Sequence, residues 1–223
     1  MEVYRDILTI LFLVGLCLSC GGTKAKKSDT EPSDSTVSPG RDLRPVIVAF
    51  GDSLTAGAGV DPDKNYPAKL QAKIDSAGYR YRVVNAGVSG DISSQGLDRV
   101  ESVASLYPAV VIIEFGANDG LRGLPSETIR RNLASIIQRL QSVGAKIVLA
   151  GMEIPPNYGP QYTSSFRDIF PSLAKEYRTS LIPFFLEKVG GHPELNQEDG
   201  IHPTAQGYGI VVENVWKVLR PLL

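Results

Sequence analysis

Ser53 lies in the short motif GDSLT (residues 51–55), directly after an apolar run at 46–50. Glycine lets the backbone turn sharply there, and the amide groups that open a helix would point near the serine side chain. Such a turn suits a nucleophile, although serine is also a favoured helix N-cap residue. The side chain of the neighbouring Asp52 would point away from Ser53, and we therefore assign Asp52 a structural role.

A serine nucleophile needs a general base, and the sequence offers His192 and His202. His202 follows Asp199 by three residues in the segment DGIHP, so the carboxylate can fold back to accept the Nδ1–H of the imidazole. The sequence therefore predicts Asp199 as the orienting acid, His202 as the base and Ser53 as the nucleophile. A turn that leads into a helix would explain the same segment without chemistry. His192 has no acid at this spacing and is expected in a loop.

Acyl transfer also requires hydrogen-bond donors for the oxyanion, and two further loops offer them. The segment NAGVSG at 85–90 supplies a glycine amide that can approach a ligand closely, and GANDG at 116–120 supplies the side-chain amide of Asn118. Each loop alone is also consistent with an ordinary turn. Together with GDSLT, three successive strands would each end in a group suited to catalysis.

Short apolar runs alternate with segments of helical period from residue 43 onward. The run at 109–115 is apolar almost throughout, which is typical of a central strand in a parallel sheet. The expected strands are 46–50, 82–85, 109–115, 146–150 and 181–184. The expected helices are 66–77, 127–143, 164–177 and 204–219, and Gly144 is placed to end the second of them. This alternation predicts a parallel α/β sheet whose substrate binds at the carboxyl ends of the strands.

The four segments GDSLT, NAGVSGD, GANDG and DGIHP, in this order, closely resemble the four blocks of the GDSL, or SGNH, hydrolases. The resemblance extends from about residue 46 to the final helix. It implies a flavodoxin-like three-layer α/β/α sandwich with a five-stranded parallel sheet, and no metal or organic cofactor. It also implies a catalytic triad of Ser53, Asp199 and His202. The oxyanion hole would then consist of the backbone amides of Ser53 and Gly87 and the side chain of Asn118.

Within that family, the segment MEIPPNYG at 152–159 is most similar to the bacterial esterase and lysophospholipase group related to thioesterase I. The resemblance favours simple esters, thioesters or lysophospholipids, hydrolysed through an acyl-enzyme on Ser53. Ile154, Tyr158 and Tyr162 could line an apolar acyl groove, or could pack their loop onto the body. Two alternatives stay open: a carbohydrate O-acetylesterase of the envelope, and a non-catalytic lipoprotein that serves as a binding module.

An apolar run at 7–18 precedes Ser19, Cys20 and two glycines. Its length suits a signal peptide better than a membrane-spanning helix, and the cysteine resembles that of a bacterial lipobox. An uncleaved anchor or an ordinary cleaved signal would also place the folded part outside the cytoplasm. We expect a signal peptide at 1–20, a polar flexible linker at 21–42 and a hydrolase domain at 43–223. The protein would be a periplasmic or cell-envelope lipoprotein, anchored through Cys20.

The composition indicates a globular protein, with 43% hydrophobic and 21% charged residues. A net charge of −1 gives no reason to expect a nucleic-acid partner. Both cysteines, Cys17 and Cys20, lie in the expected signal, so the domain can form neither a disulfide nor a cysteine-ligated metal site. The expected partners are a small acyl-ester or lysolipid substrate and the membrane, and the protein is expected to be a monomer.

Overall fold

Five parallel strands form one sheet in the computed structural model, which describes residues 42–223. The strands are β1 (Val46–Gly51), β2 (Arg82–Gly87), β3 (Val110–Glu114), β4 (Lys146–Ala150) and β5 (Ser180–Ile182). Their spatial order is β2-β1-β3-β4-β5. This is the strand order of flavodoxin-like folds, so the expected architecture of the sheet is confirmed.

The described residues form one compact unit, from Asp42 to Leu223. The expected signal peptide, Cys20 and all of the expected linker except residue 42 lie outside the described residues. No helix in this unit is both long and apolar enough to cross a membrane.

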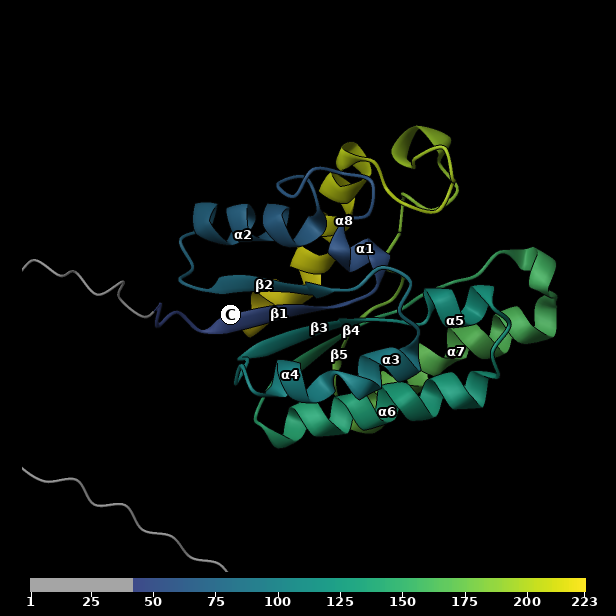
Figure 1. Cartoon of the computed structure of the whole chain (residues 1–223), viewed down its shortest axis with the longest axis horizontal. Helices are drawn as coiled ribbons and strands as arrows, with labels where there is room; N and C mark the ends of the chain where they lie inside the picture. Colours follow the sequence, from purple (N-terminus) through teal and green to yellow (C-terminus); the bar gives the residue numbers. More distant parts are fainter. Residues whose placement is uncertain (1–41) are drawn as a thin grey trace, which may run out of the picture. The chain divides into compact units, whose positions relative to one another are not determined.

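Helices cover both faces of the sheet and give three layers (Figure 1). One face carries α1 (Ser53–Ala56), α2 (Tyr66–Ser76) and α8 (Ala205–Leu219). The other carries α3 (Ser93–Asp98), α4 (Val100–Ala104), α5 (Ala117–Leu121), α6 (Ser126–Ser142) and α7 (Pro160–Tyr177). Short 3-10 turns also occur: η1 (Pro156–Tyr158) before α7, η2 (Pro193–Leu195) before α8 and η3 (Arg220–Leu222) after α8. Helix α2 packs against α8, and α6 packs against α7.

The central strands β1 and β3 are buried along their whole length. Their side chains fill the space between the helical layers, and Phe50 packs edge-on against Phe115 with ring centroids 4.9 Å apart. Helix α6 presents a continuous apolar stripe to this core, as its period predicts, and Gly144 after it has a left-handed φ of 86°. The core thereby holds the carboxyl ends of β1 and β3 side by side.

Three of the expected boundaries are wrong by two residues or more. The strand expected at 82–85 extends to Gly87. The strand expected at 181–184 ends at Ile182, because Pro183 has no N–H to continue the ladder. The helix expected at 164–177 begins four residues earlier at Pro160, whose fixed φ suits the first helical position. Tyr162 therefore lies on α7. The start of α1 at Ser53 agrees with the expected strand-to-helix turn. The sequence does not predict the short helices α3, α4 and α5, because segments of six residues or fewer show no clear helical period.

Gly87, the last residue of β2, lies against the backbone of α1. A Cβ atom at this position would be 2.6 Å from the carbonyl carbon of Thr55. Only glycine allows β2 to come this close to the helix that begins with Ser53.

Gly87→Ala is therefore expected to lower the free energy of unfolding by about 2–4 kcal/mol, because the obstructing atoms are backbone and cannot swing aside. The control is Gly209→Ala on α8, where a Cβ would meet nothing within 4 Å. That change is expected to be neutral or stabilising by up to about 1 kcal/mol. Urea denaturation, followed by the fluorescence of the single tryptophan, Trp216, measures both. Equal stability of the two variants would contradict the close approach.

Candidate active site

Ser53, His202 and Asp199 form a hydrogen-bonded chain. His202 Nε2 lies 2.8 Å from Ser53 Oγ, and His202 Nδ1 lies 2.7 Å from Asp199 Oδ2. Ser53 opens α1 directly after β1, whereas the other two residues come from the loop before α8. The structure thus brings together the three residues that the sequence indicated, in the connectivity that acyl transfer to a serine requires.

The carboxylate of Asp199 is held in its charged form. Its Oδ1 accepts hydrogen bonds from the backbone N–H groups of Ile201 and His202, at 2.9 and 3.0 Å. The hydrogen bonds from the His202 backbone and side chain, with that from the Ile201 backbone, lower the pKa of Asp199 to about 2. An anion therefore faces His202 Nδ1 at neutral pH, which suits the stabilisation of an imidazolium.

The loop of Asp199 and His202 is tied to the segment after α1. Gln197 Nε2 donates to Ala58 O at 2.8 Å and to Pro203 O at 3.0 Å. Ala58 lies just after α1, and Pro203 lies next to His202. These two hydrogen bonds of Gln197 therefore keep the His202 imidazole close to Ser53. The other histidine, His192, precedes η2, where its Nδ1 lies 3.5 Å from Glu194.

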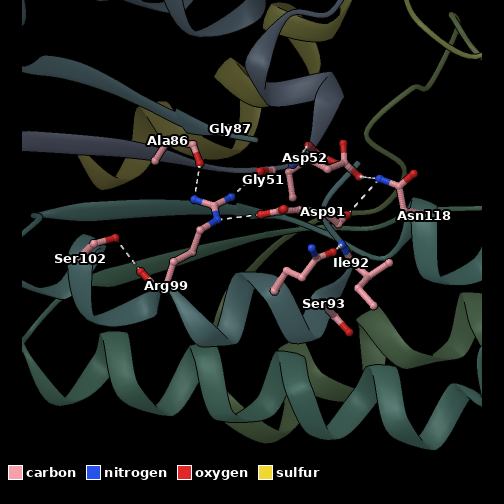
Figure 2. Close-up of polar contacts among 12 residues, drawn as sticks. Gly51, Asp52, Ala86, Gly87, Asp91, Ile92, Ser93, Arg99, Ser102 and Asn118 are labelled. Atoms are coloured by element: carbon pink, nitrogen blue, oxygen red, sulfur yellow. Dashed lines mark hydrogen bonds and ion pairs between the residues drawn. The ribbon is translucent and has the colours of Figure 1, made fainter. Parts of the chain in front are cut away.

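The three groups expected to bind the oxyanion lie at the ends of β1, β2 and β3, which are neighbours in the sheet. The Ser53 N–H is the first of α1 and has no acceptor within that helix. The Gly87 N–H donates to Asn85 Oδ1 at 2.9 Å. Asn118 Nδ2 donates to two acceptors, each at 3.0 Å (Figure 2).

The acceptors of Asn118 are Asp52 Oδ2 and the backbone carbonyl of Asp91. Together they fix the plane and direction of the amide, since each takes one of its two hydrogens. In this state, an oxyanion would have to share hydrogens with these acceptors, and with Asn85 at Gly87. The Asn118 side chain is thus oriented before any substrate binds.

A pair of buried carboxyl groups lies next to Ser53. Asp52 and Glu114 are 1% and 0% exposed. Asp52 Oδ1 caps α1 by accepting the Leu54 N–H at 3.0 Å. Glu114 Oε2 accepts the hydroxyl of Thr55 at 2.7 Å and the Asp52 N–H at 3.3 Å. The pair therefore anchors both the start of α1 and the Asn118 amide.

Burial raises the pKa values of both carboxyl groups in this pair. The pKa of Asp52 rises to about 6. Burial, followed by the charge of Asp52, raises the pKa of Glu114 well above its ordinary value. Two adjacent carboxyl groups in a buried site do not both ionise readily, and the raised pKa of Glu114 favours its protonated form.

The expected substrate-binding residues lie on the segment around η1. Tyr158 and Tyr162 line a surface hollow of about 560 Å³, to which neither Ser53 nor His202 contributes. Their hydroxyl groups donate to the carbonyls of residues 121 and 124, at 2.7 and 2.6 Å. Ile154 packs against the core beside α5. These contacts fasten the segment to α5 and the turn after it, while a role in binding an acyl chain stays a prediction.

Glu114 and Arg99 also contact the site, although neither lies in one of the four motifs. The sequence contains an indication for Glu114, because it is the one charged residue in the otherwise apolar run at 109–115. The sequence contains no such indication for Arg99, because its partners lie at strand ends that only the folded chain brings near it. Among residues 42–223, no three His, Cys, Asp or Glu side chains are grouped to hold a metal ion.

A serine, an imidazole and a carboxylate in hydrogen-bond contact at the carboxyl edge of this sheet define a serine hydrolase of the α/β class. Residues 49–210 match the GDSL-like Lipase/Acylhydrolase family. The chain is 45% identical over 178 residues to Esterase TesA of Pseudomonas aeruginosa, which covers 79% of this chain and 89% of that protein.

The chain is also 38% identical over 223 residues to Thioesterase 1/protease 1/lysophospholipase L1 of Escherichia coli K12, covering 100% of this chain and 96% of that protein. The crystal structure of AlinE4, an SGNH-hydrolase family esterase, matches at a TM-score of 0.68 and 44% identity, covering 81% of this chain and 97% of that one. The chain therefore belongs to the GDSL-like lipase/acylhydrolase family, and the resemblance noted in its four motifs is confirmed.

Glu114→Gln tests the protonation of the buried pair. A raised pKa in the folded state means that stability is lost as the pH rises, and glutamine cannot ionise. The variant is therefore expected to gain stability relative to the wild type as the pH increases from 5 to 8, measured by urea denaturation at each pH. Glu114→Ala is the control and should be about 2–4 kcal/mol less stable than Glu114→Gln at every pH, because it leaves a cavity and an unpaired Thr55. A pH-independent difference for Glu114→Gln would contradict the assignment.

Proposed function

We propose that this protein is a serine esterase that hydrolyses carboxylic esters or thioesters through an acyl-enzyme on Ser53. The observation that carries the proposal is the chain of hydrogen bonds from Ser53 Oγ through His202 to Asp199. The names of the relatives, an esterase and a thioesterase/lysophospholipase, agree with ester-bond chemistry. Medium-chain acyl esters, thioesters and lysophospholipids are the proposed substrate class.

The proposed reaction is a double displacement. Ser53 Oγ attacks the acyl carbonyl while His202 Nε2, 2.8 Å away, takes its proton. Asp199 accepts the Nδ1–H and stabilises the imidazolium. His202 then protonates the leaving alcohol or thiol, and in the second half it activates the water that attacks the acyl-enzyme.

The proposed oxyanion hole consists of the N–H groups of Ser53 and Gly87 and Nδ2 of Asn118. Each comes from the end of a different strand, and the Gly87 N–H and Asn118 Nδ2 would exchange part of their present hydrogen bonds for one to the carbonyl oxygen. A single donor of this kind typically contributes roughly 10²–10³ in kcat.

Two exposed apolar residues are chain neighbours of the proposed site residues, which favours an acyl chain over a sugar. Val88, directly after Gly87, is 45% exposed, and Ile201, directly before His202, is 47% exposed. Few large hydrophobic side chains in residues 42–223 are this exposed, and a pair beside the catalytic groups indicates contact with an apolar ligand. This observation supports a lipid-type esterase over the carbohydrate O-acetylesterase.

We also propose that the protein is exported and held at the cell envelope by a lipid on Cys20. The support is the apolar run at 7–18, followed by Ser19 and Cys20, and the polar segment that links them to the catalytic unit. A single acyl chain binds a membrane only weakly, so stable anchoring needs the additional chains that lipoproteins carry.

Hydrolysis of p-nitrophenyl esters from acetate to palmitate by the purified full-length protein tests the proposed reaction. We expect activity to peak at medium chains and to fall by at least about 10³-fold in Ser53→Ala, since the nucleophile is lost. Ser76→Ala, which alters only a hydroxyl on the outer surface of α2, is the matched control. Activity on acetate alone would favour the O-acetylesterase. Activity unchanged in Ser53→Ala would refute the mechanism. No activity in the unsubstituted protein would favour the alternative of a non-catalytic binding module.

Cys20→Ser tests the anchor in cells fed radiolabelled palmitate. The unmodified chain is expected to incorporate label and to sediment with membranes. The variant should incorporate none and appear in the soluble fraction, because only the thiol accepts the lipid. Label in the variant, or a soluble unmodified chain, would contradict the proposal.

A further inference from the structure

Exposed charges are separated between the two ends of the sheet. We call the end where the strands begin the amino edge; it consists of residues 42–45, 77–82, 105–109, 143–146, 178–180 and 217–223. Its exposed charges are mainly basic, at Arg80, Lys146, Arg178, Lys217 and Arg220. The loops at the opposite, catalytic end are mainly acidic, with exposed Asp61, Asp63, Glu153, Glu187, Glu194 and Glu198. The net charge of −1 conceals this separation.

Acidic groups near the amino edge are largely neutralised by their neighbours. Asp42 is the one acidic side chain within the edge itself, and it is paired with Arg44 at 2.8 Å. On the helices above the edge, Glu213 is paired with Lys73 and Glu176 with Arg130. The basic charge of the edge is therefore left to face the solvent.

Hydrogen bonds join the segments of the amino edge into one continuous surface. The N–H of Arg82 donates to Pro45 O at 3.0 Å, and that of Lys146 donates to Ala109 O at 3.0 Å. The carboxyl terminus completes the surface, because Leu222 O accepts Lys146 Nζ at 2.7 Å. Figure 1 shows the carboxyl terminus at the end of the sheet where β1 begins, away from α1.

Large apolar side chains project from the same edge. Leu43 is 87% exposed and Tyr107 is 79% exposed, with Leu106 beside it. Tyr107 also has a left-handed φ of 47°, which is unfavourable for a bulky residue. The fold gains little burial from its ring in return. Such a residue, grouped with other exposed apolar side chains, indicates contact with something outside the molecule.

Aromatic and basic side chains surround a hollow on the amino edge. Tyr79, Trp216, Lys217, Arg220 and Pro221 line it, and its volume is about 450 Å³. The rings of Tyr79 and Trp216 pack edge-on, with their centroids 6.0 Å apart. Trp and Tyr are enriched where a protein meets the headgroup region of a bilayer, and Lys and Arg pair there with anionic headgroups.

We propose that the amino edge is a docking surface for a membrane that contains anionic phospholipids, and that the catalytic end then faces away from the bilayer. Anionic headgroups attract the basic edge and repel the acidic catalytic end. The polar segment at 21–42 enters the described unit at residue 42, so the proposed anchor at Cys20 is joined to the protein on the side that docks.

The orientation has a consequence for the substrates. A site that faces away from the bilayer receives esters and lysolipids from the aqueous phase, and not from the membrane beneath it. The docking itself does not require the proposed ester hydrolysis.

The test uses the full-length protein and vesicles of phosphatidylglycerol or of phosphatidylcholine, each with the same small fraction of lipid that carries a nitroxide on its headgroup. Because the apolar run at 7–18 could hold the chain to either vesicle, sedimentation is not a sufficient readout. The readout is the quenching of Trp216, the single tryptophan, relative to vesicles without nitroxide. We expect quenching at least about threefold stronger with phosphatidylglycerol at low salt, and largely lost in about 1 M NaCl, which screens exposed charges.

Charge reversal tests the basic edge. Lys217→Glu/Arg220→Glu should weaken the quenching by phosphatidylglycerol vesicles at least about threefold, since each basic residue near an anionic surface contributes about fivefold in binding. Lys64→Glu/Lys188→Glu makes the same change in net charge at the catalytic end and should be quenched like the wild type. Circular dichroism checks that both variants are folded.

Tyr107→Gly separates contact with lipid from a role in the fold. Glycine adopts a φ of 47° without strain, so the urea midpoint should change little. The quenching of Trp216 should nevertheless be partly lost, because an apolar contact with the membrane is removed.

Equal quenching with the two lipids would overturn the proposal, as would unchanged quenching in the Lys217/Arg220 variant or in Tyr107→Gly. Absence of quenching by phosphatidylglycerol vesicles would also overturn it, including the case in which Val88 and Ile201 bring the catalytic end to the membrane instead. Ester hydrolysis is measured separately without vesicles, so failure of the proposed reaction is distinguishable from failure of the docking.

Discussion

The register of three neighbouring strands is the constraint on which the site depends. Gly51 of β1 is paired with Gly87 on one side and with Glu114 on the other. The segments that carry Ser53 and Asn118 therefore leave the sheet at the same level. A shift of one residue in either pairing would turn core side chains outward, so the buried strands fix this register strongly. The geometry of the reacting groups is thus a consequence of apolar packing some distance from them.

The polar side chains buried at this edge of the sheet orient the catalytic groups more than they stabilise the fold. Asp52, Glu114 and Asp119 are at most 1% exposed, and burial of such groups is unfavourable unless hydrogen bonds compensate. Within the described part of the chain, Glu114 Oε1 is left without a partner. Groups of this kind are tolerated where donors must be held in a fixed orientation, away from competing water. The cost of burial is offset by the large core around them.

Local features of the sequence predicted the parts of the site that are local in the chain. Asp199 and His202 lie three residues apart and bond through one turn, so their partnership is visible in the sequence. The period of the apolar residues likewise predicted the buried strands and long helices. The contacts of Arg99 reach back 13 and 48 residues to strand ends, and no pattern of spacing encodes such pairs. The early end of β5 is a different case, because Pro183 is visible in the sequence and its missing N–H predicts that the strand ends there.

The nucleophile and the base of this site are separated by 149 residues of chain. During synthesis, Ser53 emerges from the ribosome long before His202. The partly emerged chain has an ordinary, unactivated serine hydroxyl, and it acquires hydrolytic power only when the last loop docks beside α1. An esterase built in this order cannot cleave an ester until nearly all of residues 42–223 have been synthesised.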